Sequence, residues 1–187
     1  MTALSALWLP ILISAVVVFV LSSIIHMTPL WHKTDYPRYP QEDRVMDALR
    51  PLGMPPGDYF MPRPANTAEM RSPEFQEKMK RGPRVLMTIM PPWSGSMAKP
   101  LSLWFVYCLV VSVFAAFIAG SALHPGTPTF NAIAHYAGTT AFLGYTLALW
   151  QMSIWYQRAW SMTLKATFDG IIFALVTLAV FGWLWPR

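Results

Sequence analysis

Four long apolar runs constrain this chain more than any other feature of its sequence. They are residues 4–25, 101–123, 132–155 and 168–185. Each holds about 18 to 24 mostly apolar residues, and a helix of that length reaches roughly 27 to 36 Å, enough to cross a hydrocarbon core of about 30 Å. The sequence therefore predicts an all-α integral membrane protein with four transmembrane helices.

The composition agrees with a membrane location. Hydrophobic residues make up 55% of the 187 residues and charged residues only 12%, with a mean hydropathy of +0.38. A soluble domain of this length rarely has so few charges. The first run has no basic segment before it and ends without a small-x-small cleavage pattern, so we expect it to be a membrane span and not a cleaved signal peptide.

Lysine and arginine near the ends of the runs predict how the chain is threaded. Six basic residues flank the connection 26–99, and Arg158 and Lys165 follow the third run, whereas the loop 124–131 has no charge. Because positively charged connections stay on the cytoplasmic side, we expect residues 26–99 to be cytoplasmic and both termini to be outside.

The predicted domain organisation is a first transmembrane helix over residues 1–25, a cytoplasmic insert over 26–99 and a three-helix transmembrane region over 100–187. Within the insert, "YPQEDRVMDALRPLG" is typical of a short helix that ends at its second proline and glycine. "RSPEFQEKMKRGP" predicts another helix, with Ser72 as N-cap and Pro73 at the first helical position.

A two-stranded ribbon completes the predicted insert. "GDYFMPRP" and "RVLMTIMPP" are rich in aromatic and branched residues and bounded by glycine or proline, so they could pair. Such a ribbon is marginal in water by itself and needs the helices, the membrane surface or a partner to cover it. The insert has eleven basic and eight acidic residues, an excess that suits an anionic leaflet, but it lacks the basic stripe of a nucleic-acid binder.

His26, His32 and Asp35 follow the first run closely and raise the question of a metal site. The two histidines are six residues apart across Pro29, so no helical register brings their rings together. We therefore interpret the segment as an extended, proline-rich exit from the membrane and expect no metal here. Nine of the twelve methionines lie in the insert, but they are scattered, so copper binding is not expected and no cofactor is predicted.

The third run carries a polar stripe at helical spacing. Its candidate site residues are Asn131, His135, Thr139, Thr146 and Ser153. An ionisable residue in a span is costly to place, which makes His135 the best single candidate for handling a proton or solute. The hydroxyls can equally hydrogen-bond neighbouring helices, and we favour this packing seam because two bulky residues, Phe142 and Leu149, interrupt the stripe.

Asp169 is the one acidic residue within a run, at the start of the fourth. We expect it in the first turn of that helix, where the helix dipole favours a carboxylate, with Lys165 one turn earlier. A role in binding a coupling ion is the alternative, although transporter sites usually lie nearer the midplane.

Small residues at four-residue spacing predict close helix packing. They are Ser112, Ala116 and Gly120 in the second run, Thr140, Gly144 and Ala148 in the third, and Gly170 with Ala174 in the fourth. Such residues let helix backbones approach one another. Cys108, the one cysteine, cannot form an intramolecular disulfide, and we expect it to be a packed apolar residue.

These observations favour a non-catalytic function. We expect an accessory, assembly or scaffolding component that acts through its insert, with the lipid bilayer and either a protein partner or a second copy of the chain as its contacts. The alternative is a small oligomeric transporter or channel that uses the polar stripe. An enzyme is less expected, because no converging set of catalytic residues is visible in the sequence.

Overall fold

The computed structural model describes residues 2–28, 31–123 and 128–186. The chain forms two compact units, one from residues 1–37 with 96–187 and one from residues 38–95. The first unit is largely helical, and the second combines short helices with a two-stranded sheet.

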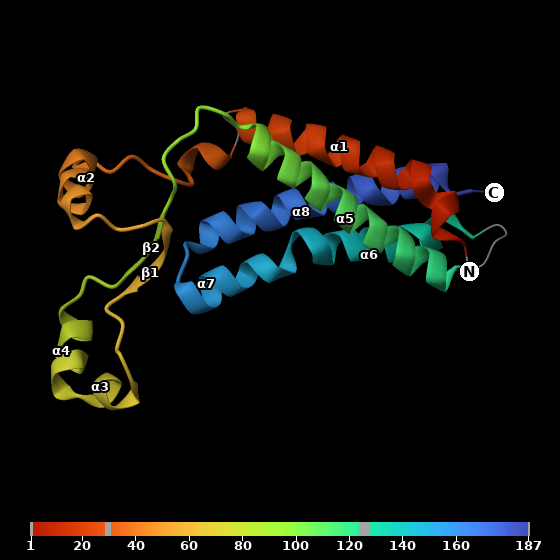
Figure 1. Cartoon of the computed structure of the whole chain (residues 1–187). Coiled ribbons are helices and arrows are strands. Elements are labelled where there is room, and N and C mark those ends of the chain that lie inside the picture. Colours follow the sequence, from red (N-terminus) through yellow and green to blue (C-terminus); the bar gives the residue numbers. More distant parts are fainter. Residues whose placement is uncertain (1, 29–30, 124–127, 187) are drawn as a thin grey trace. The chain divides into compact units, whose positions relative to one another are not determined.

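The first unit is a bundle of long helices (Figure 1). In the described part of the chain its helices are α1 (Trp8–Met27), α5 (Ala98–Ala122), α6 (Phe130–Tyr145), α7 (Trp150–Tyr156) and α8 (Trp160–Leu184). Among the described residues, three helical segments are long and apolar enough to cross a membrane: Leu4–Met27, Ala98–Ala122 and Trp160–Leu184. The predicted membrane location is therefore plausible, and three of the four predicted spans correspond to continuous helices.

The third apolar run is interrupted. α6 ends at Tyr145, and Thr146 adopts φ −124° and ψ −61°, outside the helical region. A 3-10 turn over Leu147–Leu149 then leads into α7. The Tyr107 hydroxyl donates to the carbonyl of Gly144, so a side chain from α5 satisfies a carbonyl next to the break. This run is thus two short helices joined by a turn, and not one continuous span.

Four helices of the bundle, α1, α5, α6 and α8, pack in a ring. α1 contacts α5 and α8, and α6 contacts the same two helices (Figure 1). The backbone N–H of Thr2 donates to the carbonyl of Gly120 at 2.8 Å, which places the start of the chain against the end of α5. The helices α1 and α5 therefore run in opposite directions.

The core of the bundle is built from small and aromatic side chains. Ala15, Val18, Cys108 and Ala141 are buried, and Tyr145 packs among them against Phe173. Many apolar side chains also face outward, among them Val20, Ile24, Phe114, Phe117 and Leu175. A helix that is apolar on its outward face as well as its inward face suits a lipid environment.

The second unit has the small mixed structure that its sequence predicts. Its elements are α2 (Glu42–Leu49), β1 (Gly57–Met61), α3 (Thr67–Arg71), α4 (Pro73–Arg81) and β2 (Val85–Ile89). The two strands pair antiparallel, with Gly57 opposite Ile89 and Met61 opposite Val85. The predicted ribbon is thereby confirmed.

Local capping explains where the helix α4 of this unit begins and ends. The Ser72 hydroxyl accepts the backbone N–H of Phe75 at 3.1 Å, and Pro73 occupies the first helical position. Gly82 ends the helix with φ +61°, a conformation that glycine adopts without strain. The predicted helix at this place is confirmed, whereas the single-turn α3 before it was not expected.

Candidate functional site

A group of polar side chains gathers at the end of the bundle where α1 stops. It brings together residues from three places in the chain, and we call it the polar cluster: His26, Trp31, His32, Asp35, Lys165 and Asp169. His26 lies in the last turn of α1, His32 begins a 3-10 turn, and Asp169 lies in the third turn of α8. The cluster lies wholly within the first unit.

His32 is the centre of the polar cluster. Its Nδ1 lies 2.8 Å from Oδ2 of Asp35, and its Nε2 lies 2.8 Å from Oδ2 of Asp169. The Asp169 side chain is only 5% exposed and that of His32 14%. An ionised carboxylate can only accept, so both ring nitrogens donate when the imidazole carries two protons.

The remaining carboxylate oxygens also have donors. The indole Nε1 of Trp31 donates to Oδ1 of Asp169 at 3.0 Å. The ammonium of Lys165 donates to Oδ1 of Asp35 at 2.6 Å and to the hydroxyl of Thr34 at 2.8 Å. Every carboxylate oxygen of the cluster is thus paired, which is what buried charged groups require.

Asp35 shows the electrostatic effect of this pairing. Its burial by itself would raise the pKa of the carboxyl group. The hydrogen bonds from His32 and Lys165, together with their positive charges, more than offset that burial, so the pKa of Asp35 lies below its ordinary value.

His26 completes the polar cluster on its exposed side. Its ring stacks on that of His32, with centroids 4.4 Å apart and planes 13° from parallel. Nδ1 of His26 lies 2.9 Å from the carbonyl oxygen of Ser22. Because a carbonyl can only accept, Nδ1 donates, and in a neutral imidazole Nε2 then keeps its lone pair.

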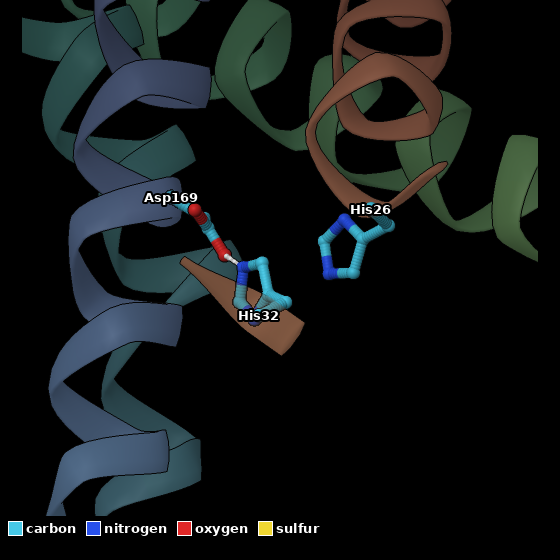
Figure 2. Close-up of side chains that lie close together, drawn as sticks. All are labelled: His26, His32 and Asp169. Carbon is cyan, nitrogen blue, oxygen red and sulfur yellow. Dashed lines mark hydrogen bonds and ion pairs between the residues drawn. The ribbon is translucent and has the colours of Figure 1, made fainter. Parts of the chain in front are cut away.

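Three side chains of the cluster could together hold a metal ion. His26, His32 and Asp169 each offer one ligand atom, and these atoms lie within 4.8 Å of one another. Figure 2 shows His32 between Asp169 and His26, with one ring nitrogen bonded to the carboxylate.

Two interpretations of this region from the sequence are wrong. We expected the rings of His26 and His32 to stay apart, but helical register does not apply, because α1 ends at Met27 and His32 belongs to a separate turn. We also placed Asp169 in a first helical turn. α8 begins at Trp160, so Asp169 lies in the third turn. The helix dipole acts mainly on the first turn and does not account for a carboxylate at this position.

Trp31 was not singled out from the sequence at all. No local pattern in the sequence links it to Asp169, which lies 138 positions later. The pair Lys165 and Asp169 was visible as a base and an acid one helical turn apart. From the sequence, one could have hypothesised that Lys165 pairs with Asp35 and that Asp169 pairs with His32.

The polar stripe of the third run separates into two parts. Asn131, His135 and Thr139 are exposed on α6 and line a groove of about 480 Å³ between α6 and α8. Thr146 and Ser153 are buried instead, and the Ser153 hydroxyl lies 2.7 Å from that of Thr163. The break after Tyr145 therefore turns the second half of the stripe toward the bundle interior.

Of the small residues predicted to mediate helix packing, some are buried between helices and others are exposed. Three residues of α5 are buried: Ser112, Ala116 and Gly120. Gly144 faces the side chain of Val111, and an added Cβ there would lie 3.1 Å from it. The Thr140 hydroxyl donates to the carbonyl of Tyr136 in its own helix, and Ala148 is exposed.

The second unit presents an apolar surface in place of a core. In residues 38–95, all of which the structure describes, only Pro62 and Phe75 are buried. Large apolar side chains that are exposed in this unit are Tyr39, Val45, Met46, Leu52, Phe60, Met61, Met70, Leu86, Met90 and Trp93. We call this set the insert surface.

No protein-family model matches the chain, and no curated protein or solved structure matches it either. The helices and their apolar faces define its class as a helical protein suited to a membrane.

Proposed function

We propose that the chain is a four-pass membrane protein that acts without catalysis, as a docking or assembly component that holds a partner protein through residues 38–95. The observation that carries this proposal is the insert surface, because ten large apolar side chains are exposed in residues 38–95, where only Pro62 and Phe75 are buried.

The energetics of folding support a partner that buries the insert surface. Ordering the backbone costs about 1 to 2 kcal/mol per residue, and burial of apolar area is the main term that offsets it. Pro62 and Phe75 are the buried residues of this unit within the described residues 38–95. A partner that covers the insert surface would supply the missing burial.

The chemistry of the insert surface suits a protein partner. It contains methionines from β1, α2 and α3, and the flexible, polarisable methionine side chain adapts to different binding surfaces. It also contains Trp93 and Tyr39, and large aromatic side chains dominate the energetics of many interfaces.

The proposal places residues 38–95 in the cytoplasm and both termini outside. The basic flanks of the connection 26–99 support this orientation, as do Arg158 and Lys165 after the third run. The third run crosses the membrane as α6 and α7 together. Thr146, at the break between them, is buried against Gly170 of α8, and irregular backbone is tolerated in a membrane where protein covers it.

Site-specific photo-crosslinking in native membranes tests the docking function. A photoreactive residue at Met90 or Trp93 should give one discrete protein adduct. The control at Glu77, an exposed polar position in α4, should give much less of it. Adducts with lipid alone at positions 90 and 93 would contradict a protein partner.

A small oligomeric transporter is the second candidate. The observation that favours it is the exposure of Asn131, His135 and Thr139 in the groove between α6 and α8. Polar groups at membrane depth need water or another chain to cover them. Labelling of cysteines at positions 139, 146 and 153 by a water-soluble thiol reagent would favour a pathway, whereas protection of 146 and 153 would leave docking as the function.

A further inference from the structure

We propose that His26, His32 and Asp169 bind a divalent first-row transition-metal ion of the Zn²⁺ type, a site that does not depend on the docking function. The ligands are one nitrogen from each imidazole and one carboxylate oxygen. The sequence led to the opposite expectation for His26 and His32, and the tertiary contact with Asp169 supplies the third donor.

The spacing of the donor atoms is close to that of a metal site. Zinc lies about 2.0 to 2.2 Å from nitrogen and oxygen ligands, so tetrahedral ligand atoms are about 3.4 Å apart. Here the His32 Nε2 and Asp169 Oδ2 are 2.8 Å apart, and the ligand atoms of all three residues lie within 4.8 Å of one another. Movements of about an ångström would bring all three to one ion.

One ring must turn for the ion to bind. A ligand lone pair lies in the plane of its imidazole, and the rings of His26 and His32 are stacked only 13° from parallel. His26 is exposed and makes no ion pair with the carboxylates in the described structure, so its ring can rotate toward the ion. The ion replaces the proton between His32 Nε2 and Asp169, and that proton leaves to the solvent.

The surroundings of the three ligands distinguish this cluster from an ordinary ion pair. Histidine ligands of metals usually donate their other ring N–H to a carbonyl or carboxylate. His26 already donates to the Ser22 carbonyl, and His32 already faces Asp35 through Nδ1. Each imidazole thus has the outer partner that fixes a metal-binding tautomer.

The third ligand has an outer partner as well. The indole of Trp31 holds Oδ1 of Asp169 and leaves Oδ2 for the ion. Lys165 in turn fixes Asp35. The arrangement therefore positions His32 and Asp169 before any ion arrives, and only the ring of His26 has to turn, which lowers the cost of binding.

The donor set selects the class of ion. Two imidazoles and one carboxylate suit Zn²⁺ and neighbouring transition metals, whereas Ca²⁺ and Mg²⁺ prefer oxygen ligands and Cu(I) prefers thiolate or thioether. Three protein ligands leave at least one position for water. That position would open on the side of His26, which is exposed, since Asp169 is buried.

Metal titration of the full-length protein in lipid nanodiscs tests the site. After treatment with a chelator, the protein is titrated with Zn²⁺ in competition with a chromogenic chelator, and with Co²⁺ to record the absorption spectrum of the bound ion. We expect one ion per chain and a Co²⁺ spectrum typical of four or five ligands. Wild-type protein that takes up no Zn²⁺ would overturn the proposal.

Matched variants separate this site from adventitious binding. His26→Ala should weaken Zn²⁺ binding at least tenfold, and it breaks none of the contacts with the carboxylates, so it should fold. The control His135→Ala removes an exposed histidine outside the polar cluster and should bind like wild type. The assignment would be overturned if His26→Ala bound Zn²⁺ as tightly as wild type. It would also be overturned if His26→Ala and His135→Ala lost the same amount of Zn²⁺ affinity.

A third variant probes the outer partner. Asp35→Asn keeps all three ligands but weakens the acceptor that orients His32, so the affinity for Zn²⁺ should fall about 10- to 100-fold. Unchanged affinity in this variant would contradict the role of Asp35 as the outer partner of a metal-bound His32.

Discussion

Nε2 of His32 lies 2.8 Å from Oδ2 of Asp169, a residue 137 positions later in the chain. This contact fixes the segment that follows α1 to the third turn of α8. Because Asp169 also accepts from Trp31, one carboxylate holds two consecutive residues of that segment.

Removal of this carboxylate should destabilise the bundle. Asp169→Ala leaves Trp31 and His32 without their acceptor in a site where the aspartate side chain is 5% exposed. Breaking a buried ion pair by removing one member costs about 3 to 5 kcal/mol of the free energy of unfolding. Denaturant titration in mixed micelles, without added metal, measures this loss.

An exposed ion pair provides the control for that measurement. Arg38 and Glu42 are paired at 3.2 Å, with the arginine side chain 82% exposed. Arg38→Ala should cost about 1 kcal/mol or less. Equal losses for Asp169→Ala and Arg38→Ala would contradict the structural importance of the polar cluster.

The contact between α8 and the break after α6 predicts a steric effect. A Cβ added at Gly170 would overlap the hydroxyl oxygen of Thr146. Gly170→Ala should therefore lower the free energy of unfolding by about 1 to 3 kcal/mol, as overpacking does. The same unfolding titration records the change.

A second substitution should relieve this clash. The Thr146 hydroxyl is buried and makes no hydrogen bond among the described residues, so Thr146→Ala removes the clashing atom without breaking a bond. The double variant should recover most of the stability lost in Gly170→Ala. No recovery would show that the two residues are not in contact.

The two buried hydroxyls that join α7 to α8 predict that loss of either one lowers stability by the same small amount. Ser153 and Thr163 share a hydrogen bond of 2.7 Å. Ser153→Ala and Thr163→Ala should each cost about 0.6 kcal/mol, the average for side-chain hydrogen bonds between membrane helices. Thr139→Ala, at an exposed position of the same stripe, is the control, and an equal cost there would argue against a packing seam.

The orientation can be tested by cysteine labelling in intact cells. In a Cys108→Ala background, a cysteine at Ser94 should react with an impermeant thiol reagent only after permeabilisation, because the basic flanks favour a cytoplasmic insert. A cysteine in place of Thr127, within the uncharged connection 124–131, should react at once. The reverse pattern would invert the proposed topology.

The ionisation of Glu74 should make the stability of the start of α4 depend on pH. The hydrogen bond from its own backbone N–H, and then that from the Ser72 hydroxyl, lowers the pKa of Glu74. A lowered pKa in the folded state means that this contribution to stability is full above the ordinary glutamate pKa and is lost as the pH falls through the folded value.

Ser72→Ala should therefore move the pKa of Glu74 upward, toward its ordinary value. It also removes the N-cap of α4, at a cost of about 1 kcal/mol. NMR titration of labelled glutamate measures the pKa. Ser94→Ala, a control outside α4, should leave the Glu74 titration unchanged, and an unchanged pKa in Ser72→Ala would show that the hydroxyl does not act on Glu74.

Features of the fold that depend on neighbouring residues could be predicted from the amino-acid sequence. The helices α1, α5 and α8 follow from runs of apolar residues, because length and composition decide whether a segment can cross a membrane. The start of α4 follows from Ser72 and Pro73, since capping acts within one helical turn. The pairing of β1 with β2 was also predictable, from two strand patterns bounded by glycine and proline.

Features that join residues far apart in the sequence depend on how the helices pack. The break at Thr146 is accompanied by contacts with Gly170 of α8 and, beside it, Tyr107 of α5, and no local signal in the third run specifies either. The polar cluster likewise arises because antiparallel packing brings the end of α1 beside α8. Buried donors and acceptors must then find partners across the bundle, and this requirement of desolvation pairs His32 with Asp169.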